Sequence, residues 1–535
     1  MRRKFLLIVS VLTILAGCKV GPDYQRPAVE SPVDWRWKKA VLIDAAPHSD
    51  GGLPSSPWQV FNDATLDQLE SLALDANQDI KAAVGRIDEA RALARVSRAD
   101  FYPQLSAQPV FSRSNQSATT FFPGAPGGGI KGIRNPSNFF SMPLDFSYEA
   151  DVWGRVRRSI SASRERAEAS VADYHTVILT VTSDVASNYF LLRALDADID
   201  VLQHTLGLRG ESLKLVNNQF KFGVADALDT NRARTDVATT EASLADAKRQ
   251  REEIAHVLAV LCGKPASVFT IDFKPLACEP PEVPAGLPSA LLERRPDVVR
   301  AERLLAASSE DIGVAVSNYF PRFALTASGG FESAEMSKLF DAHSAIFNVA
   351  TNIIQPVFTG GRNRAQLEAA NARYTEAEST YRQQVLVAFK DVEDALLDIR
   401  MRGEQAKALA DAIAAAREVT RLSTTRYQNG QVSYFDVVDA QRIELGVEQQ
   451  STLVRGERMT AAVRLIKALG GGWNCSCQYP LNTAPPAVIP IEPAVISETP
   501  LAAPAAPAPI ITPPEVPPSP LPKDQGKPDA PAPKQ

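Results

Sequence analysis

The sequence has no long apolar run beyond its first 17 residues. No later segment contains the roughly 18 consecutive apolar residues that a helix needs to cross a bilayer. This absence excludes a helical membrane span. Any segment that crosses a membrane must therefore be a β-strand, because only helices and paired strands satisfy their own backbone hydrogen bonds in lipid.

The sequence also has little excess charge and few residues suited to catalysis. Its net charge is −5 over 535 residues, which leaves no strong electrostatic footprint for nucleic acid. Its five histidines are scattered, and neither a nucleophile–base motif nor a metal-ligand spacing is present. We therefore expect neither an enzyme nor a bound metal or other cofactor.

Cysteines are few as well. Beyond Cys18 the chain has Cys262, Cys278, Cys475 and Cys477. Disulfides are permitted in an exported protein, and the last two cysteines form a C-x-C pair without a neighbouring histidine. We interpret these four cysteines as structural or incidental, and their pairing stays open.

The start of the chain has the features of an export signal. Cations at positions 2–4 precede an uncharged apolar run over residues 5–15, which is typical of a secretory signal peptide. The following Leu-Ala-Gly-Cys resembles a bacterial lipobox, in which Cys18 becomes the lipidated first residue. We expect a signal peptide over residues 1–17 and a lipidated arm over residues 18–62. An ordinary signal peptide with a chance cysteine is the alternative.

The most extended feature is an internal duplication. Residues 153–263 align without a gap with residues 360–470, at a constant offset of 207. The glycine at position 223, for example, matches Gly430. A repeat of this length marks a duplicated structural unit, so we expect two copies of one long helical hairpin.

Each copy is expected to belong to a larger repeat made of a helix, a β-hairpin and a long helical hairpin. The first repeat spans residues 63–280 and the second spans residues 281–473. Their opening helices are expected at residues 63–100 and 287–318, each before an aromatic pair and a proline. The alternating segments that follow predict strands at residues 104–112, 138–152, 322–332 and 346–358.

A narrow apolar stripe indicates that the helical hairpins are long. Between Tyr174 and Leu206 apolar residues recur every ~3.6 residues, as in a coiled-coil seam. A helix over residues 154–222 would be about 100 Å long, and its return helix, residues 227–262, would be about half as long. We predict that the opening helix stacks end to end on the return helix. The second repeat would do the same with its return helix at residues 434–469.

The segment over residues 474–535 is rich in proline and alanine. Such a composition cannot bury a core and predicts a disordered, partly polyproline tail. A passive tail is the simpler interpretation, and a role in binding cell wall or a partner is the alternative.

Strand and helix lengths together favour a conduit. Each of the four expected strands is long enough to supply the ~9–11 residues of a membrane-spanning strand, but four strands cannot close a barrel and lipid does not tolerate an open edge. The chain must therefore oligomerise if its strands enter a membrane. Helices of about 100 Å cannot lie within a bilayer about 30 Å thick, so they must project from it.

Four motifs carry a family resemblance. They are CKVGPDYQRP at residues 18–27, LLERRPDV at 291–298, PVFTGGRNRA at 356–365 and LGGGW at 469–473. Together they resemble the signatures of the OprM/NodT-type outer-membrane efflux lipoproteins, within the wider TolC-like family. The resemblance extends from Cys18 to Trp473.

The resemblance implies a mixed α and β membrane protein with a TolC-like fold. It implies a homotrimer with a shared 12-stranded β-barrel in the outer membrane, continued by a 12-helix α-barrel in the periplasm. The implied partners are a periplasmic membrane-fusion adaptor, an inner-membrane RND-type pump and outer-membrane lipid. The implied function is a passive exit duct for drugs or other small toxic compounds, without catalytic residues or a cofactor.

The resemblance also implies an iris-like gate at the periplasmic end of the second helical hairpin. It assigns Tyr427, Asp439 and Arg442 to the polar network of that gate, with Gln428 where some relatives have a basic residue. Around a threefold axis, three Asp439 carboxylates would form an acidic ring that favours cations, and Asp436 would add to it. Taken alone, an Asp and an Arg three residues apart on a helix are an ordinary exposed pair worth about 0.3–0.5 kcal/mol.

Contact with the adaptor is expected at the hairpin ends. The candidate residues are Gly223, Asp229, Arg232 and Gly430. Two other functions stay open from the sequence: an exit channel for type I protein secretion, and a structural coiled-coil lipoprotein without a pore. The latter predicts no conductance in a planar bilayer.

Overall fold

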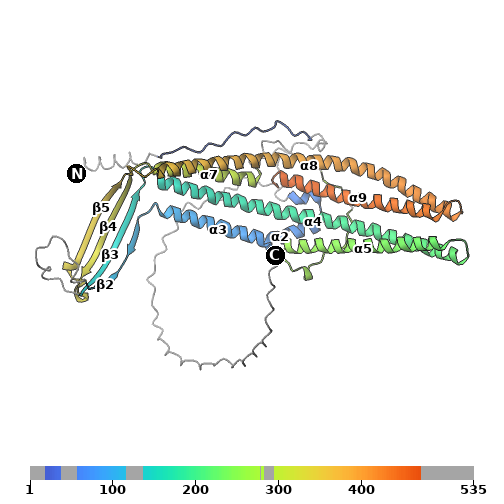
Figure 1. Cartoon of the computed structure of the whole chain (residues 1–535), viewed down its shortest axis with the longest axis horizontal. Helices are drawn as coiled ribbons and strands as arrows, with labels where there is room; N and C mark the ends of the chain where they lie inside the picture. Colours follow the sequence, from blue (N-terminus) through green and yellow to red (C-terminus); the bar gives the residue numbers. More distant parts are fainter. Residues whose placement is uncertain (1–18, 38–56, 116–135, 277–278, 282–293, 472–535) are drawn as a thin grey trace, which may run out of the picture. The chain divides into compact units, whose positions relative to one another are not determined.

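The computed structural model describes the secondary structure of one compact unit, Met1–Cys477 (Figure 1). The described residues are 19–37, 57–115, 136–276, 279–281 and 294–471. The expected signal peptide, Cys18 and the expected tail lie outside them, as do Cys278, Cys475 and Cys477. Cys262 is a free and buried thiol.

Two very long helices run through the unit. Helix α4 spans Arg155–Lys221 and α8 spans Arg362–Gln428, with 67 residues each, so both are about 100 Å long. Their return helices, α5 (Ala227–Leu261) and α9 (Tyr434–Ala468), have 35 residues each. The α4–α5 and α8–α9 hairpins lie side by side, with their turns at the end away from the strands (Figure 1). These lengths confirm the predicted duplication of a long helix and its shorter return. Among the helices that the structure describes, none combines the length and the apolarity needed to cross a membrane.

The opening helix predicted over residues 63–100 is in fact two helices. They are α2 (Ala64–Ala76) and α3 (Gln78–Ala99), separated by Asn77 in an extended conformation. The Asn77 side chain accepts hydrogen bonds from the backbone N–H groups of Asp79 and Ile80, at 2.8 and 3.1 Å. An Asn side chain that caps a new helix in this way competes with continuation of the preceding one.

The same asparagine joins the opening helices to the return helix. Its Nδ2 donates to the backbone oxygen of Leu261, the last residue of α5, over 2.8 Å. Gly263 follows with a φ of 63°, and a Cβ there would lie 2.6 Å from the backbone oxygen of Ala76. Helix α3 therefore begins where α5 ends, which confirms the predicted end-to-end stacking in the first repeat.

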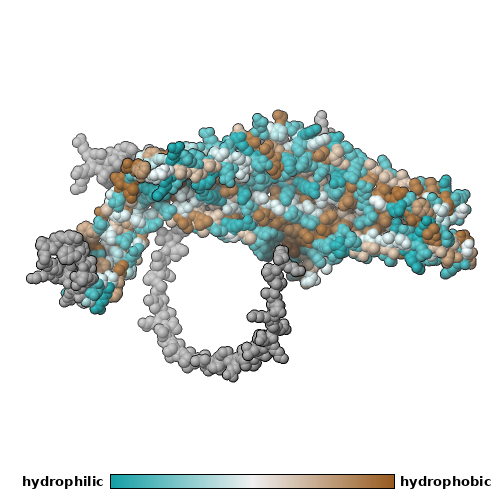
Figure 2. Space-filling model, in the orientation of Figure 1, coloured by the Kyte–Doolittle hydropathy of each residue, from teal (hydrophilic) through white to brown (hydrophobic). Residues whose placement is uncertain are grey.

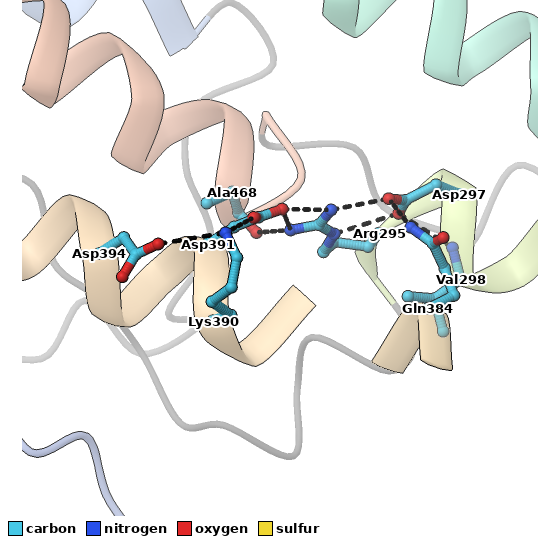
Figure 3. Close-up of polar contacts among 8 residues, drawn as sticks. All are labelled: Arg295, Asp297, Val298, Gln384, Lys390, Asp391, Asp394 and Ala468. Atoms are coloured by element: carbon cyan, nitrogen blue, oxygen red, sulfur yellow. Dashed lines mark hydrogen bonds and ion pairs between the residues drawn. The ribbon is translucent and has the colours of Figure 1, made fainter. Parts of the chain in front are cut away.

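The second repeat has an equivalent joint with different chemistry. The described opening helix of this repeat is α7 (Pro296–Ser317), and the expected start near residue 287 falls within 282–293, which lie outside the described residues. Arg295 precedes this helix and donates to the backbone oxygen of Ala468, the last residue of α9, over 3.3 Å (Figure 3). The end-to-end arrangement is again confirmed.

Arg295 also holds α7 to α8 through carboxylates. Its Nη2 donates to Asp297 at 2.7 Å and to Asp391 at 3.1 Å (Figure 3). Gln384 of α8 donates to the same Asp297 carboxylate over 2.6 Å. The motif at residues 291–298 thus contributes an ion network, where the first repeat uses the neutral amide of Asn77.

The strands form one antiparallel sheet. They are β1 (Gln104–Ala107), β2 (Val110–Ser114), β3 (Ser137–Ala150), β4 (Arg322–Ser333) and β5 (Ala345–Ile354). Strands β1 and β2 both pair with β3, which pairs with β4, which pairs with β5. The two predicted β-hairpins are therefore present, and β3 and β4 join them into one sheet.

Two strand predictions need correction, and proline explains both. The strand expected at 104–112 is interrupted at Gln108 and Pro109, although β1 and β2 keep one register along β3. Pro109 has no N–H to donate to the ladder, and neither has Pro143 on the facing stretch of β3. Strand β5 ends at Ile354 rather than at 358, two residues before Pro356.

The main core lies where the long helices pass the two joints. Tyr189 of α4 and Tyr381 of α8 are both fully buried. The Tyr189 hydroxyl donates to Asp63 over 2.7 Å. Trp35 of the N-terminal arm packs edge-on against Phe389, with 6.1 Å between ring centroids. The arm therefore covers one side of this core.

Candidate functional site at the ends of the helical hairpins

Both helical hairpins turn through a glycine. Gly223 and Gly430 have φ values of 75° and 71°, which other residues adopt only with strain. In each turn the residue after the glycine donates to a carbonyl one turn back: Val224 to Gln219 at 2.8 Å, and Gln431 to Arg426 at 2.9 Å. This is the bonding pattern of a Schellman C-cap, so the two glycines are required by the turns themselves.

The two turns start their return helices differently. Asp226 caps α5 by accepting from the backbone N–H of Leu228 over 3.2 Å. In the second turn Ser433 and Asp436 form a capping box, in which the Asp436 carboxylate accepts from the N–H and the hydroxyl of Ser433 at 3.0 and 2.8 Å. Asp436 is therefore engaged in the cap of its own helix.

Tyr427 connects the second hairpin to the first. Its hydroxyl donates to Oε1 of Gln219 on α4 over 2.6 Å. Its ring packs against Tyr434, with 5.4 Å between centroids, beside buried Val216 of α4 and Val437 of α9. Burial raises the pKa of Tyr427, and the nearby Asp229 raises it further, so the phenol keeps its proton and remains a donor.

Asp439 and Arg442 form the ion pair expected from their spacing on α9. The two groups are 2.5 Å apart, and their side chains are 38% and 71% exposed. Within one chain this is an exposed i, i+3 pair, which by itself contributes at most about 0.5 kcal/mol. Any larger role has to come from neighbouring copies.

Arg232 links the two hairpins as well. It pairs with Asp229 at 3.5 Å on α5, and its guanidinium lies 5.5 Å from the ring centroid of Phe435 on α9. Two of the residues predicted for adaptor contact, Asp229 and Arg232, are therefore paired with each other, and Arg232 also contacts the second hairpin. The other two, Gly223 and Gly430, lie at the turns, with no atom within 4 Å of a Cβ built on either.

One buried residue at this site was missed by the sequence analysis. Arg209 of α4 donates to the backbone oxygen of Asp236 at 3.1 Å and to the Thr240 hydroxyl at 2.7 Å. Burial lowers the pKa of Arg209. Burial also raises the pKa of Asp236, whereas the positive charges of Arg209 and Arg442 lower it. A comparison of the two copies could have identified Arg209, because the matching position in the second copy is Ala416.

No metal centre is found in the part of the chain that the structure describes. There, no three His, Cys, Asp or Glu side chains come together in a group that would hold a metal ion. The contacts described above for the hairpin ends are hydrogen bonds, ion pairs and packing between helices.

Comparison with known proteins places the chain in a family. A family model described as outer membrane efflux protein matches residues 69–264 and 287–471. Cation efflux system protein CusC of Escherichia coli K12 is 31% identical over 471 residues, which covers 87% of this chain and 99% of that protein. Solvent efflux pump outer membrane protein SrpC of Pseudomonas putida is 31% identical over 471 residues, covering 88% and 98%.

Solved structures agree with this relationship. The outer-membrane channel OprN superposes with a TM-score of 0.77 at 29% identity, covering 85% of this chain and 100% of that chain. A structure of CusC superposes with a TM-score of 0.73, also at 29% identity. The family model matches well over half of the chain, and the fold, the repeats and the length all agree: the chain belongs to the outer membrane efflux protein family.

Proposed function

We propose that this outer-membrane efflux protein is the passive exit duct of a tripartite pump for drugs or other small toxic compounds. Three copies would contribute four strand positions each to a 12-stranded barrel, and two helical hairpins each to a 12-helix periplasmic tunnel. The observation that carries the proposal is the pair of equal hairpins, with 67-residue outward and 35-residue return helices, that continue from one shared sheet.

The faces of β5 support membrane insertion. Phe347, Val349 and Ile353 lie on one face with Thr351 and are 89%, 69% and 62% exposed. Asn348 and Asn352 lie on the other face on either side of Ala350, with Ile346 and Ile354 at the ends of the strand. Apolar residues toward lipid and polar residues toward a lumen are the pattern of a membrane-spanning strand. Because β5 is an edge strand of this sheet, its free edge would pair with a neighbouring copy.

The helices also carry apolar surface that a neighbouring copy would cover. Apolar residues are visible on the helical part of the molecule as well as on the strands (Figure 2). Val260, Leu386 and Val419 are among the large apolar side chains exposed on α5 and α8. A trimer that closes a tube would bury part of this surface.

The gate would lie at the hairpin ends. Tyr427 bonded to Gln219 would hold the second hairpin against the first, and opening would require that contact to break. Three Asp439–Arg442 pairs around the axis would line the constriction. Arg232 and Asp229, together with the exposed turns at Gly223 and Gly430, would receive the periplasmic adaptor, with an RND-type pump beyond it.

The division of the chain completes the proposal. Residues 1–17 would be removed as a signal peptide, and Cys18 would carry the lipid of an arm that extends to residue 62. The repeats at 63–280 and 281–473 would form the duct, followed by the Pro/Ala-rich tail.

Planar bilayers test the duct directly. The purified full-length lipoprotein is expected to give discrete conductance steps and to cross-link as a trimer. A protein that cross-links but never conducts would be a structural lipoprotein without a pore, and the proposal would fail. Replacement of Cys18 by Ser is expected to abolish palmitate labelling of the chain.

A further inference from the structure

One arginine holds most of the first described residues of the N-terminal arm, and Lys19 before them donates to Glu310 over 3.0 Å. Arg158, near the start of α4, donates from Nε to the backbone oxygen of Val20 at 2.9 Å. Its Nη2 donates to the backbone oxygen of Gly21 at 2.9 Å, and its Nη1 donates to that of Pro22 at 2.8 Å. One guanidinium thus binds three consecutive carbonyl groups of the arm.

The remaining donors of Arg158 are also used. Nη1 donates to Glu310 of α7 at 3.0 Å, and Nη2 donates to the largely exposed Asp23 carboxylate at 3.4 Å. A guanidinium has five N–H donors, and here five acceptors surround it. The Arg158 side chain is fully buried. All donors of this buried arginine are satisfied by residues 20–23 of the arm and by the facing Glu310 carboxylate, so it forms a specific binding site for that segment.

Two glycines make room for this contact. A Cβ on Gly313 of α7 would lie 2.2 Å from Cδ of Arg158. A Cβ on Gly21, whose φ is 94°, would lie 2.7 Å from Cα of Gly313. The arm, Arg158 and α7 therefore meet at a distance that only glycine permits. We call Arg158, Glu310 and Gly313 the arginine socket.

The socket lies at the junction between the sheet and the helices. The Val20 N–H donates to the backbone oxygen of Trp153 over 3.1 Å, three residues after the end of β3. The Trp153 indole donates to the backbone oxygen of Pro321, which directly precedes β4, over 2.9 Å. The arm is thus fixed where both central strands of the sheet reach their helical ends.

The duplication indicates that the socket serves one segment only. The position that matches Arg158 in the second repeat is Ala365. Helices α3 and α7 begin and end 218 residues apart, and at this offset Glu310 and Gly313 correspond to Ala92 and Arg95. All three socket residues are absent from the other copy. The socket therefore occurs in only one of the two copies, as expected if it binds the single N-terminal arm.

We propose that the arginine socket is the docking site of the acylated N-terminus and fixes the lipid anchor beside the junction of β3 and α4. This rests on the proposed lipidation of Cys18, which is the residue next to Lys19. Without the socket, the next side chain of the arm that packs against the core is Tyr24. The acylated residue would then be six residues from a fixed point, with a reach of up to about 21 Å.

Trypsin cleavage of the Lys19–Val20 bond tests the socket, because a protease needs the arm undocked. The full-length lipoprotein is digested in detergent micelles, and the product that starts at Val20 is followed by mass spectrometry. Arg158→Met keeps the apolar stem and removes all five donors. Gly313→Ala leaves every charge in place and only fills the space. Both variants are expected to be cleaved at this bond at least about tenfold faster than the wild type.

Arg164→Met is the matched control, because Arg164 lies on the same helix, is 59% exposed and pairs only with Glu168 among the described residues. It is expected to be cleaved at the wild-type rate. Wild-type rates in both socket variants would overturn the proposal. If Arg158→Met does not fold, Gly313→Ala decides alone. The mass of the released N-terminal peptide reports lipidation separately: an unmodified Cys18 would refute the proposed anchor, whereas the cleavage rates still test the socket.

Discussion

The Tyr427 hydroxyl on α8 donates to Oε1 of Gln219 on α4 over 2.6 Å, and this bond joins the second helical hairpin to the first near their turns. Both residues lie in the last three residues of their helices. Near the turns the described hairpins also share a small buried cluster around Val216 and Tyr434 and the contact between Arg232 and Phe435, so this hydrogen bond is one of a few contacts that hold them together.

Replacing Tyr427 by Phe is expected to favour the open gate. The change keeps the ring contact with Tyr434 and removes a neutral hydrogen bond worth about 0.5–1.5 kcal/mol, so the open-to-closed ratio should rise about twofold to tenfold. Single-channel recording measures the ratio. Gln219→Leu should have the same effect, and the double variant should add little to either change. Full additivity of the two changes would show that the bond does not hold the gate.

Replacing Asp439 and Arg442 together by Ala is expected to raise single-channel conductance. Within one chain the pair is exposed and worth little, so a measurable effect requires the three copies to bring the pairs to a constriction. Glu418 and Arg421 form the matched control, because they are an exposed i, i+3 pair on α8. Their double Ala variant should conduct like the wild type. Unchanged conductance in the Asp439 and Arg442 variant would remove these residues from the gate.

The extent of the long helices follows from the sequence, because their seam continues without interruption and both end at a glycine required by the turn. The break at Asn77 does not follow, since an asparagine within an apolar pattern reads as helix until its side chain is seen to cap α3. The gap between β1 and β2 depends on Pro109, which the sequence shows, and on Pro143 of the facing strand, which is a tertiary effect.

Some residues of the candidate site were likewise predictable from the sequence and others were not. The family resemblance singled out Asp439 with Arg442, and the duplication led from them to Asp229 and Arg232. Spacing predicts the ion pairs themselves, because each pair is local on one helix. The bond between Tyr427 and Gln219 spans 208 positions, and no local pattern predicts such a contact. Arg209 was detectable only by comparing the two copies, where a charge faces an alanine at the matching position.

Replacing Arg295 by Gln is expected to destabilise the second joint. The change leaves the Asp297 and Asp391 carboxylates without their shared cation (Figure 3). They are 24% and 34% exposed, so the expected cost is about 2–3 kcal/mol, below that of a fully buried pair. Denaturant unfolding of the detergent-solubilised protein measures the loss. Arg382→Gln, which removes an exposed pair with Glu378, should cost less than about 0.5 kcal/mol.

The same substitution has an expected pH signature. Burial by itself raises the pKa of Asp297, but the hydrogen bond and charge of Arg295, together with the hydrogen bonds from Val298 and Gln384, leave that pKa below its usual value. A carboxyl with a lowered pKa stabilises the fold above its unfolded pKa, near 4, and this contribution is lost as the pH falls through the folded pKa. The difference between wild type and Arg295→Gln should therefore shrink below about pH 4. A difference that stays constant with pH would contradict the role assigned to this ion pair.

Glu70 on α2 gives the opposite dependence. Its side chain is buried, and neither carboxylate oxygen has a hydrogen-bond partner within the described residues. Burial raises the pKa of Glu70 to about 9, with a further contribution from Asp67 on the same helix. Across the joint, the buried thiol of Cys262 also interacts with Glu70, and Lys264 lies close to that thiol. The folded protein therefore holds a proton that the unfolded chain releases near pH 4.

A raised pKa stabilises the fold below the unfolded pKa, and this contribution is lost as the pH rises toward about 9. The wild type should lose up to about 1.4 kcal/mol of stability per pH unit over that range because of Glu70. Replacing Glu70 by Gln should remove this slope and leave the protein more stable than the wild type at pH 8. Glu89→Gln, an exposed change on α3, should keep the wild-type slope. Thermal unfolding of the full-length protein at several pH values between 5 and 8 measures both slopes, and parallel curves for wild type and Glu70→Gln would show that Glu70 is charged in the fold.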